Sequence, residues 1–426
     1  METQADEKTF KNYLLFFTGQ QVSILGSSIA QFVLIWWITL ETGSALYLSI
    51  AAFVGFAPMI VITPFAGVLA DRWNRKKIIF TVDLLQALTT TALIFFFWLG
   101  DVTILQVLLF LALRSVYQAF NAPTVTAIVP LMVPREKLSR VNGLNYLLTG
   151  AMTLMGPVVA ALLLAVAKVE QVLWIDPSTF VVALLPLLII RIPSVRVGQE
   201  RTPFKKDFSA GLSFIKSVRG LIPLITLATA LNFLLVPLDT LLPYFVAFDH
   251  LGRAESLALI LASMQGGMLA GGVMMSVVKE FRRKIVASLV FIYVIFTGYA
   301  LIAVTPTGVF WFMALGGLVL GFGVAPANVS VQTILQTRVP LKMQGRIGSV
   351  TMALASAATP LGMLLAGSAV GFTGTSNLFL VCVVVGVSLL TLSWFFTGVR
   401  YVETGEEKTV LEEAKRQQSA DSYSDV

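Results

Sequence analysis

A short charged segment between two long apolar runs decides how this chain must be built. It reads GVLADRWNRKK at residues 67–77, and the apolar runs that flank it cover about 45–70 and 77–99. Each run exceeds the roughly 20 apolar residues that an α-helix needs to cross a bilayer. The segment therefore predicts a basic turn that joins two membrane-spanning helices, and the rest of the chain can be compared with this pattern.

The same pattern of apolar runs, bounded by charges or turn residues, repeats along the whole chain. The runs lie at about 13–39, 45–70, 77–99, 102–131, 141–167, 171–191, 220–247, 255–278, 285–304, 308–335, 346–371 and 375–398. Only helices and closed barrels satisfy the backbone in lipid, and these runs are too long and too uniformly apolar for alternating barrel strands. We predict an all-α membrane protein with twelve transmembrane helices.

The composition excludes the common soluble classes. Of the 426 residues, 57% are hydrophobic and only 12% are charged, about half the charge of a soluble domain. The chain has a single histidine, His250, and a single cysteine, Cys382, and it lacks the G-x-x-x-x-G-K-[ST] pattern of nucleotide-binding loops. We therefore expect no enzyme, no catalytic residue, no metal site and no cofactor.

The basic residues predict how the chain is oriented. If both termini are cytoplasmic, 27 of the 30 Lys and Arg residues fall on cytoplasmic segments, with Lys168 and Arg253 outside and Arg114 within a span. Such asymmetry follows the positive-inside rule. The net charge of +7 is then an orientation signal, and we expect the lipid bilayer as a partner and no nucleic acid.

Two halves of the chain resemble each other. Val133-Pro134 recurs as Val339-Pro340 and Arg140-Val141 recurs as Arg346-Ile347, both 206 residues later. The pattern predicts two pseudo-symmetric six-helix bundles, at 1–191 and 220–400, joined by a cytoplasmic linker at 192–219 and followed by a cytoplasmic tail at 401–426. Duplicated bundles are typical of secondary transporters, whose binding site lies between the halves near the midplane.

Charged residues inside the spans are the first candidates for mechanism, because a buried charge is costly in a bilayer. Arg114 lies about 13 residues past Asp101, roughly 20 Å into the membrane. A carboxylate in an apolar cavity gains proton affinity. We predict that Asp239 pairs with Arg114 and carries a coupling proton, with Asp83 as a further acid. Structural roles remain open, and Asp176, near a span end, is expected to cap or bend its helix.

Polar stripes on single helix faces are candidates for the lining of a substrate cavity. The predicted lining residues are Gln20, Ser27, Gln31, Gln118, Asn121, Asn145, Met152, Asn232, Gln265 and Met268. The alternative role for each is to join neighbouring helices, since polar residues often do so in membranes. Gly150, Gly156 and Pro157 form a small-residue motif in span five, where Pro157 removes a backbone hydrogen bond and should bend the helix.

Three of these segments resemble the motifs of one family, the major facilitator superfamily. Residues 67–77 are similar to its loop signature G-x-L-A-D-R-x-G-R-K, with Asn74 in place of Gly. Arg114 with Gln118 resembles its R-x-x-x-Q-G motif, and residues 150–157 resemble its antiporter motif. The resemblance implies the major facilitator fold and a conformational latch between the halves. The residues assigned to this latch are Gly67, Asp71, Arg72, Arg75 and Lys76.

Within that superfamily, residues 20–58 and 122–144 resemble the macrolide-efflux and siderophore-exporter branch of prokaryotic drug:proton antiporters. The resemblance implies a monomer in the prokaryotic plasma membrane that exports amphipathic small molecules, and so confers antibiotic resistance, in exchange for protons by alternating access. Two alternatives stay open. One is a dedicated exporter or importer of a single metabolite, lipid or siderophore, and the other is a membrane sensor or enzyme that transports nothing.

Overall fold

The computed structural model describes residues 7–190, 220–278, 281–339 and 356–403, with scattered positions between 213 and 218 and between 347 and 354. These residues form helices and short turns, without a strand among them. Eleven of the described helices are long and apolar enough to cross a membrane, and Thr359–Thr373 is a shorter apolar helix. The prediction of an all-α membrane protein is confirmed.

The helices of the first half follow the predicted spans closely. They are α1 (Glu7–Thr42), α2 (Ala45–Arg72), α3 (Arg75–Leu99), α4 (Ile104–Met132), α5 (Leu138–Leu164), α6 (Val169–Leu173) and α7 (Ile175–Ile189). The predicted sixth span is thus divided in two at Trp174. Local capping explains other boundaries, because Asn74 accepts a hydrogen bond from the Lys77 amide and Thr103 forms a capping box with Gln106.

The second half repeats the pattern after residue 220. Its helices are α9 (Leu221–Tyr244), α10 (Ala254–Val277), α11 (Lys284–Ala303), α12 (Phe310–Arg338), α14 (Thr359–Thr373) and α15 (Thr375–Phe396). A π-helical turn, η2 (Phe245–Asp249), extends α9. The helix predicted at 346–371 corresponds to α14 and to positions before it that are helical where they are described, while residues 346, 349, 352 and 355 lie outside the described residues.

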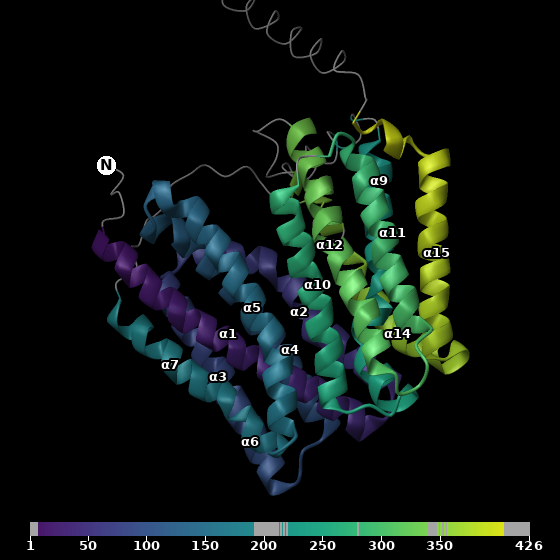
Figure 1. Cartoon of the computed structure of the whole chain (residues 1–426). Helices are drawn as coiled ribbons and strands as arrows, with labels where there is room; N and C mark the ends of the chain where they lie inside the picture. The colour runs from purple at the N-terminus through teal and green to yellow at the C-terminus, as the bar shows by residue number, and fades with distance from the viewer. Residues whose placement is uncertain are drawn as a thin grey trace, which may run out of the picture.

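The helices stand side by side in two groups, α1–α7 and α9–α15, which we call the N-half and the C-half (Figure 1). In the N-half, α1 packs on α5 and α7, and α3 packs on α4. In the C-half, α12 packs on both α10 and α11. The predicted boundaries at 192–219 and 401–426 fall largely outside the described residues and stay predictions.

Backbone-to-backbone packing marks the C-half. Gly267 and Gly271 of α10 face the carbonyl groups of α12, and Gly321 of α12 faces the carbonyl of Met264. A Cβ atom at any of these glycines would collide with the opposing backbone. Glycine lets two membrane helices approach to this distance, so α10 and α12 are held by close van der Waals contact.

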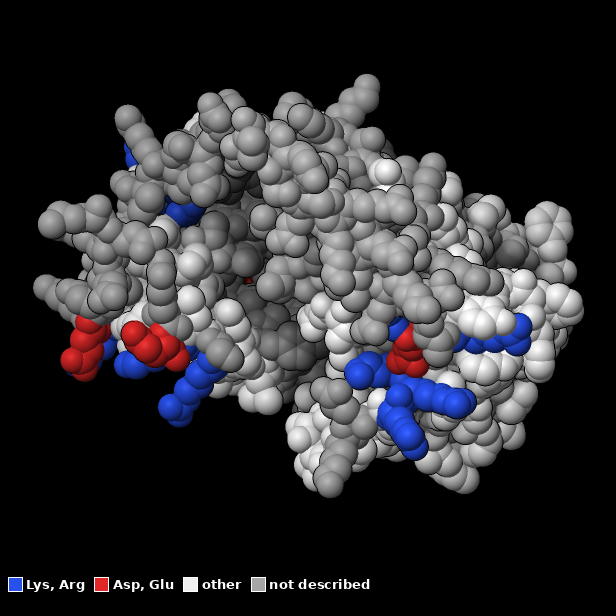
Figure 2. Space-filling model, turned by 90° about the horizontal axis from the view of Figure 1, so that it is seen from above, with Lys and Arg blue, Asp and Glu red and all other residues white. Residues whose placement is uncertain are grey.

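The two halves meet at the end of the bundle opposite the basic turn of residues 67–77, and we name the two ends the basic end and the opposite end. The first turns of α2 lie at the opposite end, where Gly367 of α14 packs against Ser49 and the carbonyl of Ala45. Viewed from above, onto the basic end, the surface is hollowed between the two halves (Figure 2). The halves are therefore in close contact at one end and separated by a hollow at the other.

Candidate functional site

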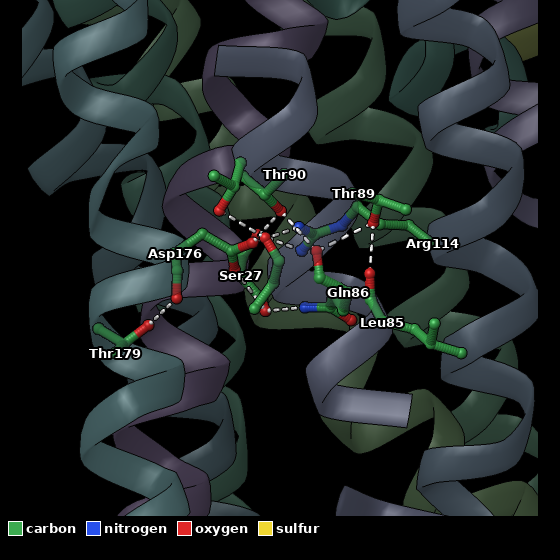
Figure 3. Close-up of polar contacts among 10 residues, drawn as sticks. Ser27, Leu85, Gln86, Thr89, Thr90, Arg114, Asp176 and Thr179 are labelled. Carbon is green, nitrogen blue, oxygen red and sulfur yellow. Dashed lines mark hydrogen bonds and ion pairs between the residues drawn. The ribbon is translucent and has the colours of Figure 1, made fainter. Parts of the chain in front are cut away.

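A buried ion pair lies inside the N-half, within the helices predicted to span the membrane. Nη1 of Arg114 on α4 is 3.1 Å from Oδ2 of Asp176 on α7, and the two side chains are only 2% and 3% exposed. Nη2 of Arg114 donates a hydrogen bond to the carbonyl of Ser27 at 3.0 Å. Figure 3 shows the guanidinium and the carboxylate turned toward each other between the helices.

Two hydroxyl groups donate hydrogen bonds to the Asp176 carboxylate, and an amide donates to one of these hydroxyls. Thr90 of α3 donates to Oδ2 at 2.6 Å, and the hydroxyl of Ser27 donates to Oδ1 at 3.0 Å. Gln86 in turn donates to the Ser27 hydroxyl at 2.8 Å. A buried ion pair is tolerated when its remaining polar atoms are hydrogen bonded, and this network supplies bonds to both carboxylate oxygens, whereas Nε of Arg114 has no hydrogen-bond partner among the described residues. We call this group the Asp176 tier.

A second carboxylate forms its own group nearer the basic end. Asp83 of α3, 9% exposed, accepts a hydrogen bond from Nδ2 of Asn121 at 2.7 Å and one from Nε2 of Gln20 at 3.4 Å. Both donors are uncharged amides, and none of the ion pairs found among the described residues includes Asp83. We call this group the Asp83 tier.

The two tiers repeat at a fixed spacing on three helices. Each residue of the Asp83 tier has a counterpart seven positions along the same helix in the Asp176 tier. The pairs are Gln20 and Ser27 on α1, Asp83 and Thr90 on α3, and Asn121 and Arg114 on α4. Seven residues make about two helical turns, or roughly 10 Å of rise. The sequence therefore places polar groups at two levels between α1, α3, α4 and α7. We call this polar region between the helices the N-half seam.

A small polar cavity lies between the tiers. It is lined by Ser23, Asp83, Gln86, Ala87, Asp176 and Phe180. Both carboxylates thus border the same space, together with a hydroxyl and an amide. A cavity with several polar partners is the kind that holds ordered water in proteins.

The predicted pairing of Arg114 with Asp239 is wrong. The partner of Arg114 is Asp176, because α4 packs with its own half around this seam while Asp239 belongs to α9 of the C-half. Asp239 is exposed and makes no hydrogen bond or ion pair with any other described residue. Asp176 was expected to cap or bend its helix, and it does stand in the first turn of α7, directly after the break at Trp174.

The predicted cavity residues separate into two groups. Four of them join helices: Gln20, Ser27 and Asn121 belong to the tiers, and Asn145 exchanges hydrogen bonds with the Tyr13 hydroxyl at 2.9 and 3.2 Å. Six others are half-buried or exposed and make no such bond with another described side chain. They are Gln31, Gln118, Met152, Asn232, Gln265 and Met268. Only this second group is available to line a substrate path.

The span-five motif is a point of contact between α5 and α1. A Cβ atom on Gly156 would collide with Ser28, so the two helices cross with almost no gap. Pro157 cannot donate to the carbonyl four residues earlier, and that carbonyl, of Thr153, instead accepts a hydrogen bond from the Ser28 hydroxyl at 3.3 Å. Gly150, by contrast, faces open space.

The predicted latch is described only in part. The side chains of Asp71 and Arg72 and the surroundings of Gly67 lie outside what the structure describes, although the backbone of all three residues belongs to α2. Nζ of Lys76 donates hydrogen bonds to the carbonyls of Leu188 and Ile190 at 2.9 and 2.7 Å. Lys76 therefore caps the end of α7 and joins two helices of the same half. Arg75 is half-buried on the first turn of α3.

The fold and the motifs define a membrane transporter, and comparison with known proteins gives its family. Residues 16–357 match the model of the Major Facilitator Superfamily, so the chain belongs to that superfamily. It is a multi-pass membrane protein that carries small molecules, and it is not an enzyme.

Several relatives cover most of the chain. It is 30% identical to macrolide efflux protein A of Streptococcus pyogenes over 86% of this chain and 92% of that protein. It is 25% identical to the multidrug efflux pump Tap of Mycobacterium tuberculosis strain H37Rv, over 86% and 88%. Among solved structures, a bacterial homologue of the iron transporter ferroportin in an inward-facing state has a TM-score of 0.69 at 16% identity, with 89% and 98% covered. That likeness concerns the fold alone.

Proposed function

We propose that this protein is a proton-coupled exporter of drugs or other amphipathic small molecules, and that it works by alternating access. The observation that carries the coupling is Asp83, a buried carboxylate without a cationic partner among the described residues, beside a buried Arg114–Asp176 ion pair. Ionisable groups at membrane depth that border a polar cavity are typical of proton pathways. The names of the efflux relatives support the direction of transport and the class of substrate.

The proposed orientation has the basic end and both termini in the cytoplasm of a prokaryotic cell. The concentration of Lys and Arg at the basic end supports it through the positive-inside rule. In this orientation the hollow of Figure 2 faces the cytoplasm, from which an exporter takes up its substrate. Transport then requires the contact of α14 with α2 at the opposite end to open while the basic end closes, with the N-half and the C-half moving within one monomer.

We assign the substrate path to the exposed and half-buried residues on both halves. Gln31, Gln118 and Met152 contribute from the N-half, and Asn232, Gln265 and Met268 from the C-half. Methionine and amide side chains adapt to ligands of different shape, which suits a transporter of several amphipathic compounds. Asp239 on α9 is a second candidate acid, exposed in the same half as Asn232.

The proposal is tested with the purified full chain in proteoliposomes that carry a pH gradient, acid inside. We expect uptake of a macrolide and of chemically unrelated fluorescent amphiphiles, and a collapse of that uptake when the gradient is dissipated. Asp83→Asn should abolish pH-driven accumulation and keep exchange of substrate across the membrane. Asp239→Asn tests the second acid in the same assay.

Two outcomes would contradict the proposal. Accumulation that ignores the pH gradient in the wild-type protein would remove proton coupling. Transport of a single native metabolite, lipid or siderophore, with none of the amphiphiles, would favour the dedicated transporter in the same fold.

A further inference from the structure

Three ionisable side chains meet in the N-half seam, two acids and one base. Asp83 comes from α3, Asp176 from α7 and Arg114 from α4. The groups that α1 presents to this seam are the neutral Gln20, Ser23 and Ser27. Among the described residues packed around the cavity, no further charged side chain balances the second acid.

The net charge of these three side chains decides how many protons the seam binds. With both acids ionised, the seam carries a net charge of −1 in a region of low dielectric, where an unbalanced charge is strongly disfavoured. One bound proton makes the seam neutral. Because both carboxylates border one cavity, the proton can be held by either of them.

We propose that Asp83 and Asp176 form a single proton-binding unit that shares one exchangeable proton across the cavity, and that Arg114 sets the number of protons at one. The proposal rests on the proposed function for its role in transport, since this unit would be the coupling site. It also changes the role of Asp176, which becomes a proton acceptor as well as the partner of Arg114.

The cavity provides the path between the two acids. The amide nitrogen of Gln86 is engaged with Ser27, which leaves its carbonyl oxygen as an acceptor, and the Ser23 hydroxyl lines the same space. A water molecule held there accepts the proton from Asp83 as that O–H bond breaks, and it releases another of its protons to Asp176. The water is regenerated, the negative charge moves to Asp83, and the net charge of the seam is unchanged.

The test counts carboxylic protons by infrared difference spectroscopy of the purified full chain, without substrate, between high pH and about pH 6, where ordinary exposed carboxylates, with pKa values near 4, stay ionised. All variants carry Asp239→Asn, so that this exposed carboxylate does not contribute. We expect one protonated carboxyl in this background and none after Asp83→Asn. The decisive variant is Asp176→Asn. We expect none there either, because Arg114 then neutralises Asp83 and no proton is needed.

Variants of Arg114 change the net charge of the seam and should therefore change the number of protons that it binds. Arg114→Gln should raise the signal to two protonated carboxyls, and the double variant Arg114→Gln with Asp176→Asn should return it to one. The double variant leaves no buried charge without a partner, so its folding shows whether the site accepts the loss of the Asp176 carboxylate. Its single proton should disappear when Asp83→Asn is added.

Two results would overturn the proposal. If Asp176→Asn retains the carboxylic proton of Asp83, the acids titrate independently. If Ser23→Ala leaves the rate of proton uptake after a pH jump unchanged, the cavity is not the path; we expect slower uptake with the same number of protons. Since no substrate is present, a failure of drug transport with this pattern intact would contradict the exporter and leave the proton unit standing.

Discussion

At the scale of single residues, the crossing of α5 over α1 separates two glycines of one motif. Gly156 lies against Ser28, whereas Gly150 faces open space. We expect Gly156→Val to lower the free energy of unfolding by about 1–3 kcal/mol, because overpacking forces the helices apart. Gly150→Val is the matched control and should leave the thermal melting temperature of the purified protein nearly unchanged. Equal melting temperatures for the two variants would show that the close approach of α5 to α1 does not contribute to the stability of the protein.

Some residues of the site could be predicted from the sequence, and others could not. Arg114 was recognised from its depth in an apolar span, and Asp83 from its position in span three. The partner of Arg114 was missed, because Asp176 stands near a span end and such acids commonly cap helices. The signal that could have found it is the tier spacing. Polar residues recur seven positions apart on three of the spans, which indicates two polar levels between the helices. The charge of Arg114 at one of these levels requires an acid, and a fourth helix must supply it.

At the scale of elements, the π-helical turn η2 and the residues after it bury the only histidine of the chain. His250 is 4% exposed, packs against the ring of Phe245 with a centroid distance of 4.4 Å, and has an Nδ1 atom without a partner among the described residues. Leu251 follows with a positive φ of 55°, a strained backbone for a residue with a side chain. Burial lowers the pKa of His250 from its ordinary value of 6.5, although Asp249 and the Pro306 carbonyl act in the opposite direction.

This lowered pKa predicts an acid-sensitive element. A histidine whose pKa is lower in the folded state binds protons more weakly there than in the unfolded chain, so the folded state loses stability as the pH falls through 6.5. We expect the melting temperature to fall between about pH 7 and pH 5, and His250→Phe to make this fall shallower. His250→Gln, which is polar and does not titrate, serves as the control and should have the same effect. An unchanged slope in both variants would exclude His250 as the source.

The sequence predicted the ends of the long helices better than the irregular turns within or next to them. The long helices begin and end within a few residues of the apolar runs, because lipid allows little else for such runs. The break between α6 and α7 and the π-turn were not predicted. Trp174 and Phe245 are apolar residues inside apolar runs, so hydropathy carries no signal for an irregular turn at either position.

In the whole molecule, α14 packs on α2 and α10 packs on α5, so both contacts join the two halves, and the contact of α14 with α2 lies at the opposite end. Gly367 packs against Ser49, and Gly371, one turn further along α14, faces open space. We expect Gly367→Leu to separate the halves at this end. The distance between spin labels on Glu41→Cys and Asn377→Cys, both exposed there, should lengthen in electron resonance measurements.

The same measurement has a simple background and a direct control. Cys382 is the chain's only cysteine, so Cys382→Ala removes all competing labelling. Gly371→Leu should leave the label distance unchanged. A distance that is the same in all three proteins would mean that this contact does not keep the opposite end closed. The repeat in the sequence predicted two halves, but contacts such as Gly367 with Ser49 join residues over 300 positions apart, and no periodicity in one chain indicates them.

The glycine contacts between α10 and α12 have a consequence for how the two duplicated halves can diverge. In the C-half these buried positions accept almost no increase in volume, whatever the chemistry of the side chain. In the N-half seam, a substitution succeeds or fails by its charge and hydrogen bonds, and amides can stand close to carboxylates. A scan of all single substitutions should therefore show tolerance that depends on side-chain size along the contact of α10 with α12, and tolerance that depends on charge and hydrogen bonding in the N-half seam. Variants that the two places tolerate would then differ in kind.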